Sequence, residues 1–81
     1  MNIEVKMFAA ARQIAGAETV TVELPDDSRV ADLRQALAER FPDAQPVLNH
    51  AMFAIDMEYV SDNVALSPTA EIACIPPVSG G

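Results

Sequence analysis

The residues best placed to do chemistry lie at the very end of the chain, in Pro76-Pro77-Val78-Ser79-Gly80-Gly81. The α-carboxylate of Gly81 is ionised at pH 7 and is a poor electrophile until it is activated, typically as a mixed anhydride with AMP. Such an acyl-adenylate accepts sulfur to become a thiocarboxylate, or a thiol or an amine to become a thioester or an amide. Each outcome requires a carboxylate that reaches the active site of another protein.

The types of these six residues suit an arm that projects from a domain. Pro76 and Pro77 lack a backbone N–H, so they end sheet pairing and direct the following chain outward. Val78 and Ser79 then span the distance, and Gly80 has no Cβ, so it passes a narrow channel. Six extended residues reach about 20 Å at roughly 3.3–3.6 Å each. An ordinary frayed terminus is the alternative, and the tail alone does not decide between the two.

Other candidate groups in the sequence are weaker. His50 is the only histidine and has no motif around it. Cys74 lies on the inward side of a predicted strand, which favours a buried and inert thiol. Asp56 and Glu58, beside Tyr59, could form a carboxylate pair for acid–base catalysis, but acids in a hairpin turn are usually only solvated. The sequence has no glycine-rich phosphate loop and no cluster of metal ligands, so we expect no metal site.

Composition indicates one small globular domain. The 81 residues are 51% apolar and 21% charged, which favours a compact fold over disorder. No apolar run approaches the roughly 20 residues of a membrane span, the N-terminus lacks a secretion signal, and there is one cysteine, so we expect a cytoplasmic protein with no membrane partner. The net charge of −7 disfavours nucleic-acid binding. It serves either solubility or attraction towards a basic partner.

The hydrophobic pattern predicts five strands and two helices. Helix formers from Ala9 to Ala15 end at Gly16, a natural stop. A stripe with spacings of three and four residues predicts a long helix from Val30 to Arg40, with Ser28 as its N-cap. Residues 43–51 have no clear period and are predicted to be a loop. The strands are predicted at 3–7, 19–24, 52–55, 59–60 and 72–75.

These elements predict an α+β roll, in which one helix lies across one face of a single sheet. We expect a domain over residues 1–75 and an arm over 76–81. Phe8 and Ile75 alternate out of phase with Val5 and Cys74, so they should lie on the uncovered face. Apolar side chains there, beside the arm, suggest a surface for partner docking. Single apolar residues scattered on a surface are the alternative.

Several motifs together resemble one known family. They are Phe8-Ala9 with Arg12 and Gly16 after the first strand, Val30-Ala31-Asp32-Leu33-Arg34, Ala54-Ile55 with Tyr59-Val60, and the ending from Ile75 to Gly81. Over almost the whole chain they resemble the small subunit of molybdopterin synthase, in the ubiquitin-like sulfur-carrier group. Two segments depart from that pattern: Asp56 stands where the family usually has Asn, and Pro68-Thr69-Ala70-Glu71 replaces a Gly-Asp-Glu-like turn.

The resemblance implies a β-grasp fold, with a mixed sheet of about five strands and a flexible C-terminal tail. It also implies that an adenylating enzyme uses ATP to activate Gly81, which sulfur then converts to a thiocarboxylate. The tail would insert into the large synthase subunit and deliver sulfur to cyclic pyranopterin monophosphate. The chain would bind no permanent cofactor and would not be catalytic alone. The alternatives are a carrier for thiamine thiazole or cysteine synthesis, a protein modifier joined to lysines, and an interaction module whose tail does nothing.

Overall fold

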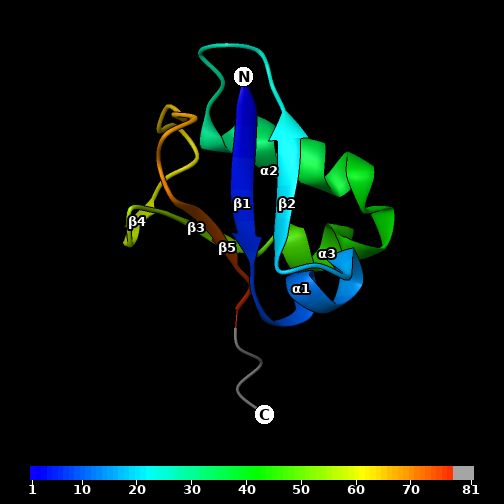
Figure 1. The fold of residues 1–81 in the computed structure, drawn as a ribbon. Helices are drawn as coiled ribbons and strands as arrows, with labels where there is room; N and C mark the ends of the chain where they lie inside the picture. Colours follow the sequence, from blue (N-terminus) through cyan, green and yellow to red (C-terminus); the bar gives the residue numbers. More distant parts are fainter. Residues whose placement is uncertain (78–81) are drawn as a thin grey trace.

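The computed structural model describes residues 1–77. In this part of the chain, five strands form one mixed sheet in the order β2-β1-β5-β3-β4 (Figure 1). The pairs β1–β2, β3–β4 and β3–β5 are antiparallel, whereas the central pair β1–β5 is parallel. The strands are β1 (Asn2–Met7), β2 (Thr19–Glu23), β3 (Met52–Ile55), β4 (Glu58–Val60) and β5 (Ile72–Ile75).

The first two strands form a hairpin with a helix in its connection. α1 (Ala9–Ala15) ends at Gly16, whose φ of 71° is a left-handed conformation that glycine adopts without strain. Val5 lies opposite Val20 in the β1–β2 register, and both side chains are buried. The predicted alternation and the predicted helical stop are therefore confirmed.

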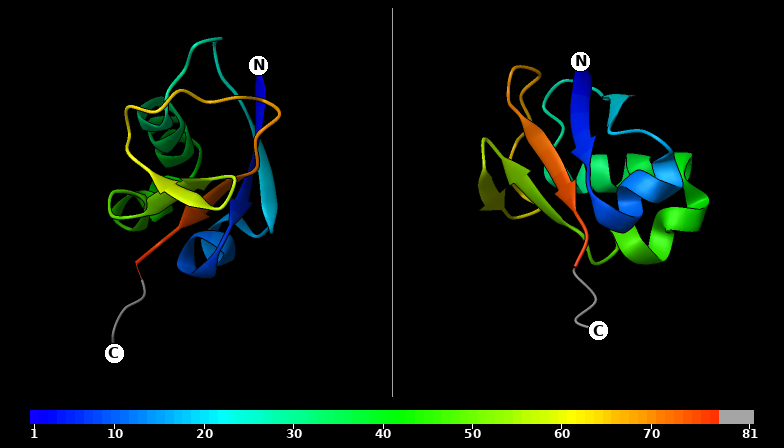
Figure 2. Two further views of the ribbon diagram at one scale, coloured as in Figure 1. Left: turned by 90° about the vertical axis from the view of Figure 1, so that its left-hand side faces the viewer. Right: turned by 60° about the horizontal axis from the view of Figure 1, so that its bottom comes forward.

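The long helix α2 (Val30–Arg40) has the predicted bounds. Val30, Leu33 and Leu37 have no exposed surface, and Phe41 is half-buried beyond the helix end. Figure 2 shows α2 packed against one side of the sheet. Its apolar stripe supplies one wall of the core and leaves the other face of the sheet uncovered by this helix.

The start of α2 differs from the prediction. Ser28 does not cap the helix, because its Oγ donates to the carbonyl oxygen of Pro25 at 2.7 Å. Arg29 is the N-cap instead, and its backbone N–H donates to Oδ2 of Asp32 at 2.8 Å. A carboxylate in the first turn thus satisfies the capping residue and interacts favourably with the positive end of the helix dipole.

The predicted loop over 43–51 is also wrong. The chain forms a 3₁₀ turn, η1 (Pro42–Ala44), followed by the short helix α3 (Gln45–Leu48). Ala44 and Leu48 are buried against the core. Pro46 occupies the first turn of α3, where its missing N–H is harmless. Two elements of three and four residues are too short to produce a periodic pattern, so packing rather than local sequence defines them.

The core lies between the sheet and the helices. The strand residues that face α2 alternate with residues on the other face, as their burial shows. This arrangement confirms the predicted α+β roll and its mixed five-stranded sheet. The buried apolar side chains with less than 2% exposure include Ile3, Val5, Val30, Leu33, Leu37, Leu48, Phe53, Ile72 and Cys74.

Candidate functional site

The end of the described chain leaves the centre of the sheet. β5 lies between β1 and β3 and ends at Ile75. Pro76 is buried and Pro77 is exposed, so the described chain ends at the surface, at the opposite end of the molecule from the N-terminus (Figure 1). The predicted carboxylate of Gly81, together with Val78, Ser79 and Gly80, lies outside the described residues.

An apolar groove lies on the uncovered face beside this exit. Its volume is about 310 Å³. Phe8 and Ile75, the two predicted docking residues, both line it, and Phe8 is 44% exposed. The structure therefore brings these two residues together, whereas their role in docking stays a prediction. The other lining residues are Lys6, Ala54, Met57, Tyr59, Glu71 and Ala73.

The groove residues that the sequence did not reveal come from cross-strand pairing. Ala54 lies opposite Tyr59 in the β3–β4 register and opposite Ala73 in the β3–β5 register. Paired positions share one face of a sheet, so Tyr59 extends the surface that Ile75 begins. Parity within each strand could have indicated the face, but only the strand order brings these side chains into one groove.

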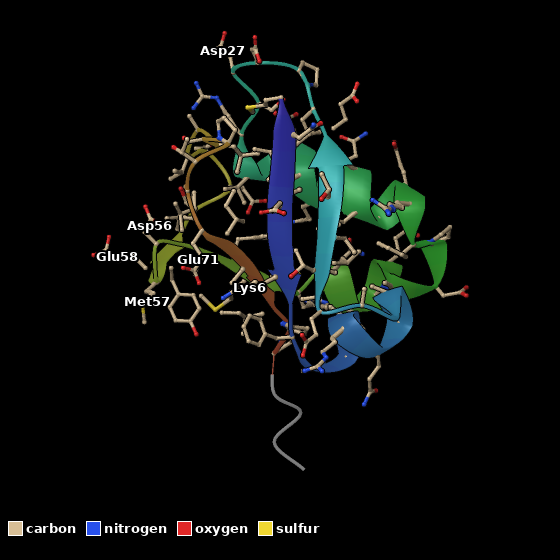
Figure 3. The ribbon with its side chains drawn as sticks, viewed as in Figure 1. Lys6, Asp27, Asp56, Met57, Glu58 and Glu71 are labelled. Carbon is tan, nitrogen blue, oxygen red and sulfur yellow. The ribbon has the colours of Figure 1, made fainter. Side chains whose placement is uncertain are left out.

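Charged residues border one side of the groove. Lys6 Nζ lies 3.0 Å from Oε1 of Glu71, and Figure 3 shows these two side chains pointing toward one another. Asp56 and Glu71 are joined twice, because the Asp56 N–H donates to the Glu71 carbonyl at 2.8 Å and the Glu71 N–H donates to Asp56 Oδ1 at 3.0 Å. Asn at position 56 could accept the same bond through its amide oxygen. Asp in place of the family's usual Asn at position 56 thus preserves the hydrogen bond of the turn and adds a negative charge.

The turn between β3 and β4 has an uncommon backbone. Asp56 has φ 50° and Met57 has φ 70°, and positive φ at both central residues is the requirement of a type I′ hairpin turn. Asp tolerates this conformation, but the usual second residue is Gly. Met57 is nevertheless a large apolar residue there, with 91% of its surface exposed.

Other chemical candidates give no second site in the described part of the chain. His50 and Glu58 are exposed, and among residues 1–77 no group of three or more His, Cys, Asp or Glu could hold a metal ion. A hollow along α1 contains Arg12 and Glu18, whose side chains form an ion pair at 2.7 Å. Within the described range, no helix is long and apolar enough to span a bilayer.

Cys74 is the buried thiol that its strand position predicted, with no exposed surface. Burial raises its pKa from 9.0 to about 11, and the nearby positive charge of Arg34 partly opposes this effect. A nucleophilic cysteine needs a thiolate at neutral pH. Cys74 therefore contributes to packing and does not supply the reactive sulfur.

The raised pKa of Cys74 predicts a loss of stability at high pH. Above pH 9 the unfolded chain releases the thiol proton while the folded chain keeps it until about pH 11. The unfolded state then binds fewer protons, so the free energy of unfolding falls across this window, by about 2 kcal/mol. Urea denaturation between pH 8 and 11 measures this. In Cys74→Ala the free energy of unfolding should decline by about 2 kcal/mol less over the same pH range. An equal decline in both proteins would contradict the raised pKa of Cys74.

The described architecture defines a class of protein. A mixed five-stranded sheet in the order β2-β1-β5-β3-β4, with α2 across one face and the chain leaving from the central strand, is the β-grasp fold of ubiquitin-like proteins. The chain belongs to the ThiS family, whose model matches residues 5–81.

Two relatives match over essentially the full chain. The molybdopterin synthase sulfur carrier subunit of Chlamydomonas reinhardtii is 39% identical, and the match covers 100% of both chains. The human protein of the same name is 35% identical, with coverage of 99% of this chain and 94% of the relative. The family resemblance in the sequence is therefore confirmed.

Two solved structures have the same fold. SAMP1 from Haloferax volcanii, a small archaeal modifier protein, is 30% identical with a TM-score of 0.84, and the match covers 100% of both chains. A putative molybdopterin converting factor subunit 1 from Pyrococcus furiosus is 28% identical with a TM-score of 0.84, over 96% of this chain and 99% of that one. The predicted β-grasp fold is confirmed.

Proposed function

We propose that this chain is the sulfur carrier subunit of a molybdopterin synthase. The observation that carries the proposal is the full-length similarity to relatives of that name. The diglycine ending is present, and residues 1–77 offer no metal cluster or activated thiol that would suggest another chemistry. The proposed compartment is the cytoplasm, which supplies ATP and keeps the single cysteine reduced.

The chemistry is assigned to the carboxylate of Gly81. A carboxylate oxygen attacks the α-phosphorus of ATP on an adenylating partner, and pyrophosphate leaves. A sulfide equivalent, HS⁻, then attacks the acyl carbon, AMP leaves with the original oxygen, and a proton is released. The product is a thiocarboxylate. Its sulfur passes to cyclic pyranopterin monophosphate in the synthase, hydrolysis restores the carboxylate, and two carriers serve each dithiolene.

The domain itself would bind and present rather than catalyse. β5, which precedes the arm in the sequence, lies at the centre of the sheet, and the groove with Phe8 and Ile75 lies beside the end of β5. A partner that docks on this face would lie beside the point where the described chain leaves the sheet. The large synthase subunit and the adenylating and sulfur-transfer enzyme are the proposed partners.

A sulfur-loading experiment tests this function. The full chain is incubated with the adenylating enzyme of its own cell, ATP and a sulfide donor, and its intact mass is measured. We expect one oxygen to be replaced by sulfur, with fragmentation placing the change at Gly81. The loaded chain should then support dithiolene formation by the large subunit. A thiocarboxylate that forms but serves only a thiazole or cysteine synthase would instead favour the related carrier function.

A protein modifier is the second candidate, because SAMP1 is named as a modifier and matches over its full length. In that case the activated Gly81 carboxylate would form amide bonds with lysines of other proteins. Immunoblots of cell extract against this domain discriminate between the two. A ladder of heavier conjugates that persists under reducing and denaturing conditions would support the modifier, whereas a single band would support the carrier.

A further inference from the structure

The last pair of residues between β3 and β5 lies where the described chain leaves the sheet. Met52, the first residue of β3, is paired with Ile75, the last residue of β5. At the other end of the same register, the Asp56 N–H donates to the Glu71 carbonyl at 2.8 Å. Hydrogen-bonded pairs alternate with non-bonded pairs in an antiparallel ladder. Counting from that bond, Met52 and Ile75 form a hydrogen-bonded pair, which fixes the end of β5.

Arg34 holds the chain that leads into this pair. Its Nη1 donates to the carbonyl oxygens of Leu48 and Ala51, at 2.6 and 2.7 Å. Ala51 directly precedes β3, and the next position of the β3–β5 register places it opposite Pro76. Both Ala51 and Pro76 are buried. The arginine of α2 therefore reaches the part of β3 that borders the start of the predicted arm.

The guanidinium of Arg34 has a defined orientation. Its Nε and Nη2 donate to the two carboxylate oxygens of Asp62, and its centre lies 5.0 Å from the centroid of the Phe53 ring. Phe53 is paired with Cys74, next to the pair of Met52 and Ile75. Because the guanidinium is planar, a bidentate contact with one carboxylate fixes the direction of the remaining donors. Asp62 thus aims Nη1 at the carbonyl of Ala51.

We propose that Arg34 is a positioning residue for the C-terminal arm. By holding Ala51 it keeps Met52 bonded to Ile75, and this bond fixes the residue at which the arm begins. When Arg34 is replaced, the pair opens and the arm begins earlier in the chain, so the Gly81 carboxylate reaches the partner from a less defined origin. The effect on sulfur transfer rests on the proposed function, whereas the opening of the pair is a property of the domain alone.

Amide hydrogen exchange tests the opening of the pair. Arg34→Lys keeps the positive charge, but an ammonium group cannot contact Asp62 and both carbonyls together. We expect the amides of Met52 and Ile75 to exchange about tenfold faster than in the wild type, after correction for the change in the β1–β2 hairpin. Equal acceleration in the hairpin and at these two amides would overturn the proposal, because Arg34 would then only stabilise the domain as a whole.

Leu24→Ala is the control for a general loss of stability. Leu24 is buried, and its N–H donates to the Met1 carbonyl, so it lies near the N-terminus, at the opposite end of the molecule from the end of the described chain (Figure 1). A cavity there destabilises the whole domain. Exchange at Met52 and Ile75 should therefore change no more than exchange in the β1–β2 hairpin. Selective acceleration at the two amides in this variant as well would also overturn the proposal.

Single-turnover sulfur transfer tests the positioning role. Each chain is loaded as the thiocarboxylate and mixed with the large subunit at a temperature at which every variant is folded. At saturation, Arg34→Lys should transfer sulfur about tenfold more slowly, while the concentration of large subunit that gives half the maximal rate stays within about threefold of the wild type. Leu24→Ala should transfer sulfur at the wild-type rate. A normal rate at saturation in Arg34→Lys would overturn the positioning role.

Asp62→Asn provides a second variant in case Arg34→Lys does not fold. It keeps the arginine and removes the charge that orients it, and the Asp62 side chain is 47% exposed, so the domain tolerates the change. We expect the same selective acceleration at Met52 and Ile75, reduced to about threefold, and its absence would overturn the proposal. A wild-type chain that cannot be loaded with sulfur would overturn the proposed function instead, and exchange would still decide whether Arg34 holds the pair.

Discussion

Deletion of Gly81 is expected to reduce sulfur transfer by at least about 100-fold while leaving the fold intact. The deleted chain still ends in a carboxylate, on Gly80, so the chemical group is not lost. Its position changes, because the arm is shorter by roughly 3.3–3.6 Å. A displacement of about 1 Å already costs on the order of 10²-fold in a positioned reaction. Single-turnover formation of the dithiolene by the large subunit measures the effect.

The control for this deletion keeps the length of the arm. Ser79→Ala changes a predicted spacer residue without moving the carboxylate, so its transfer rate should stay within about threefold of the wild type. Both variants should unfold at the wild-type temperature, because the changes lie outside residues 1–77, which contain the core. A deleted chain that transferred sulfur at the normal rate would exclude Gly81 as the carrier of sulfur and would favour an interaction module.

The long elements could be predicted from the sequence because each has its own repeat. The stripe of Val30, Leu33 and Leu37 defines α2 without reference to any other segment, and Gly16 marks a helical end through its own backbone freedom. The prediction of Ser28 as the N-cap was wrong because Ser28 and Asp32 can both satisfy backbone N–H groups at the start of α2. In the structure the Asp32 carboxylate accepts the backbone N–H of Arg29. Local sequence contains both possibilities and does not rank them.

The candidate site was only partly predictable for a different reason. Strand parity indicated the face on which Phe8 and Ile75 lie, and parity is a local property. Tyr59 and Ala73 join them through pairings between β3, β4 and β5, which the sequence does not specify. Met57 was missed because turn residues are expected to be polar or Gly, so its apolar type at a left-handed position became informative only when the backbone was known.

Arg34 joins α2 to three other segments, and its loss is expected to have the largest effect on stability. Its Nη2 and Nε donate to the two carboxylate oxygens of Asp62, at 2.8 and 3.1 Å, and its Nη1 donates to the carbonyls of Leu48 and Ala51, at 2.6 and 2.7 Å. The guanidinium also lies 5.0 Å from the ring centroid of Phe53. A planar fork with several donors makes these contacts at once, which an ammonium group cannot.

We therefore expect Arg34→Ala to lower the free energy of unfolding by about 2–4 kcal/mol, because one carboxylate and two carbonyl oxygens lose a charged donor. The pair is partly exposed, with side-chain exposures of 20% and 47%, so water compensates in part and keeps the effect below that of a fully buried pair. A domain of this size has a stability of only about 4–12 kcal/mol, so the melting temperature should fall by about 10–25 °C. Urea and thermal denaturation both measure the change.

Two further variants show whether the network or the charge is responsible. Arg34→Lys keeps the charge but cannot reach Asp62 in two places and both carbonyls together, so it should recover less than half of the loss. Arg40→Ala removes an exposed arginine that donates to the Thr21 carbonyl and lies 5.4 Å from the Phe41 ring, and it should cost less than about 1 kcal/mol. If Arg40→Ala cost as much stability as Arg34→Ala, or if Arg34→Lys kept the full stability, the hydrogen bonds of Arg34 would contribute no more than an exposed positive charge. A loss confined to the Arg34 variants instead identifies that network as what fixes α2 to α3, β3 and the segment after β4.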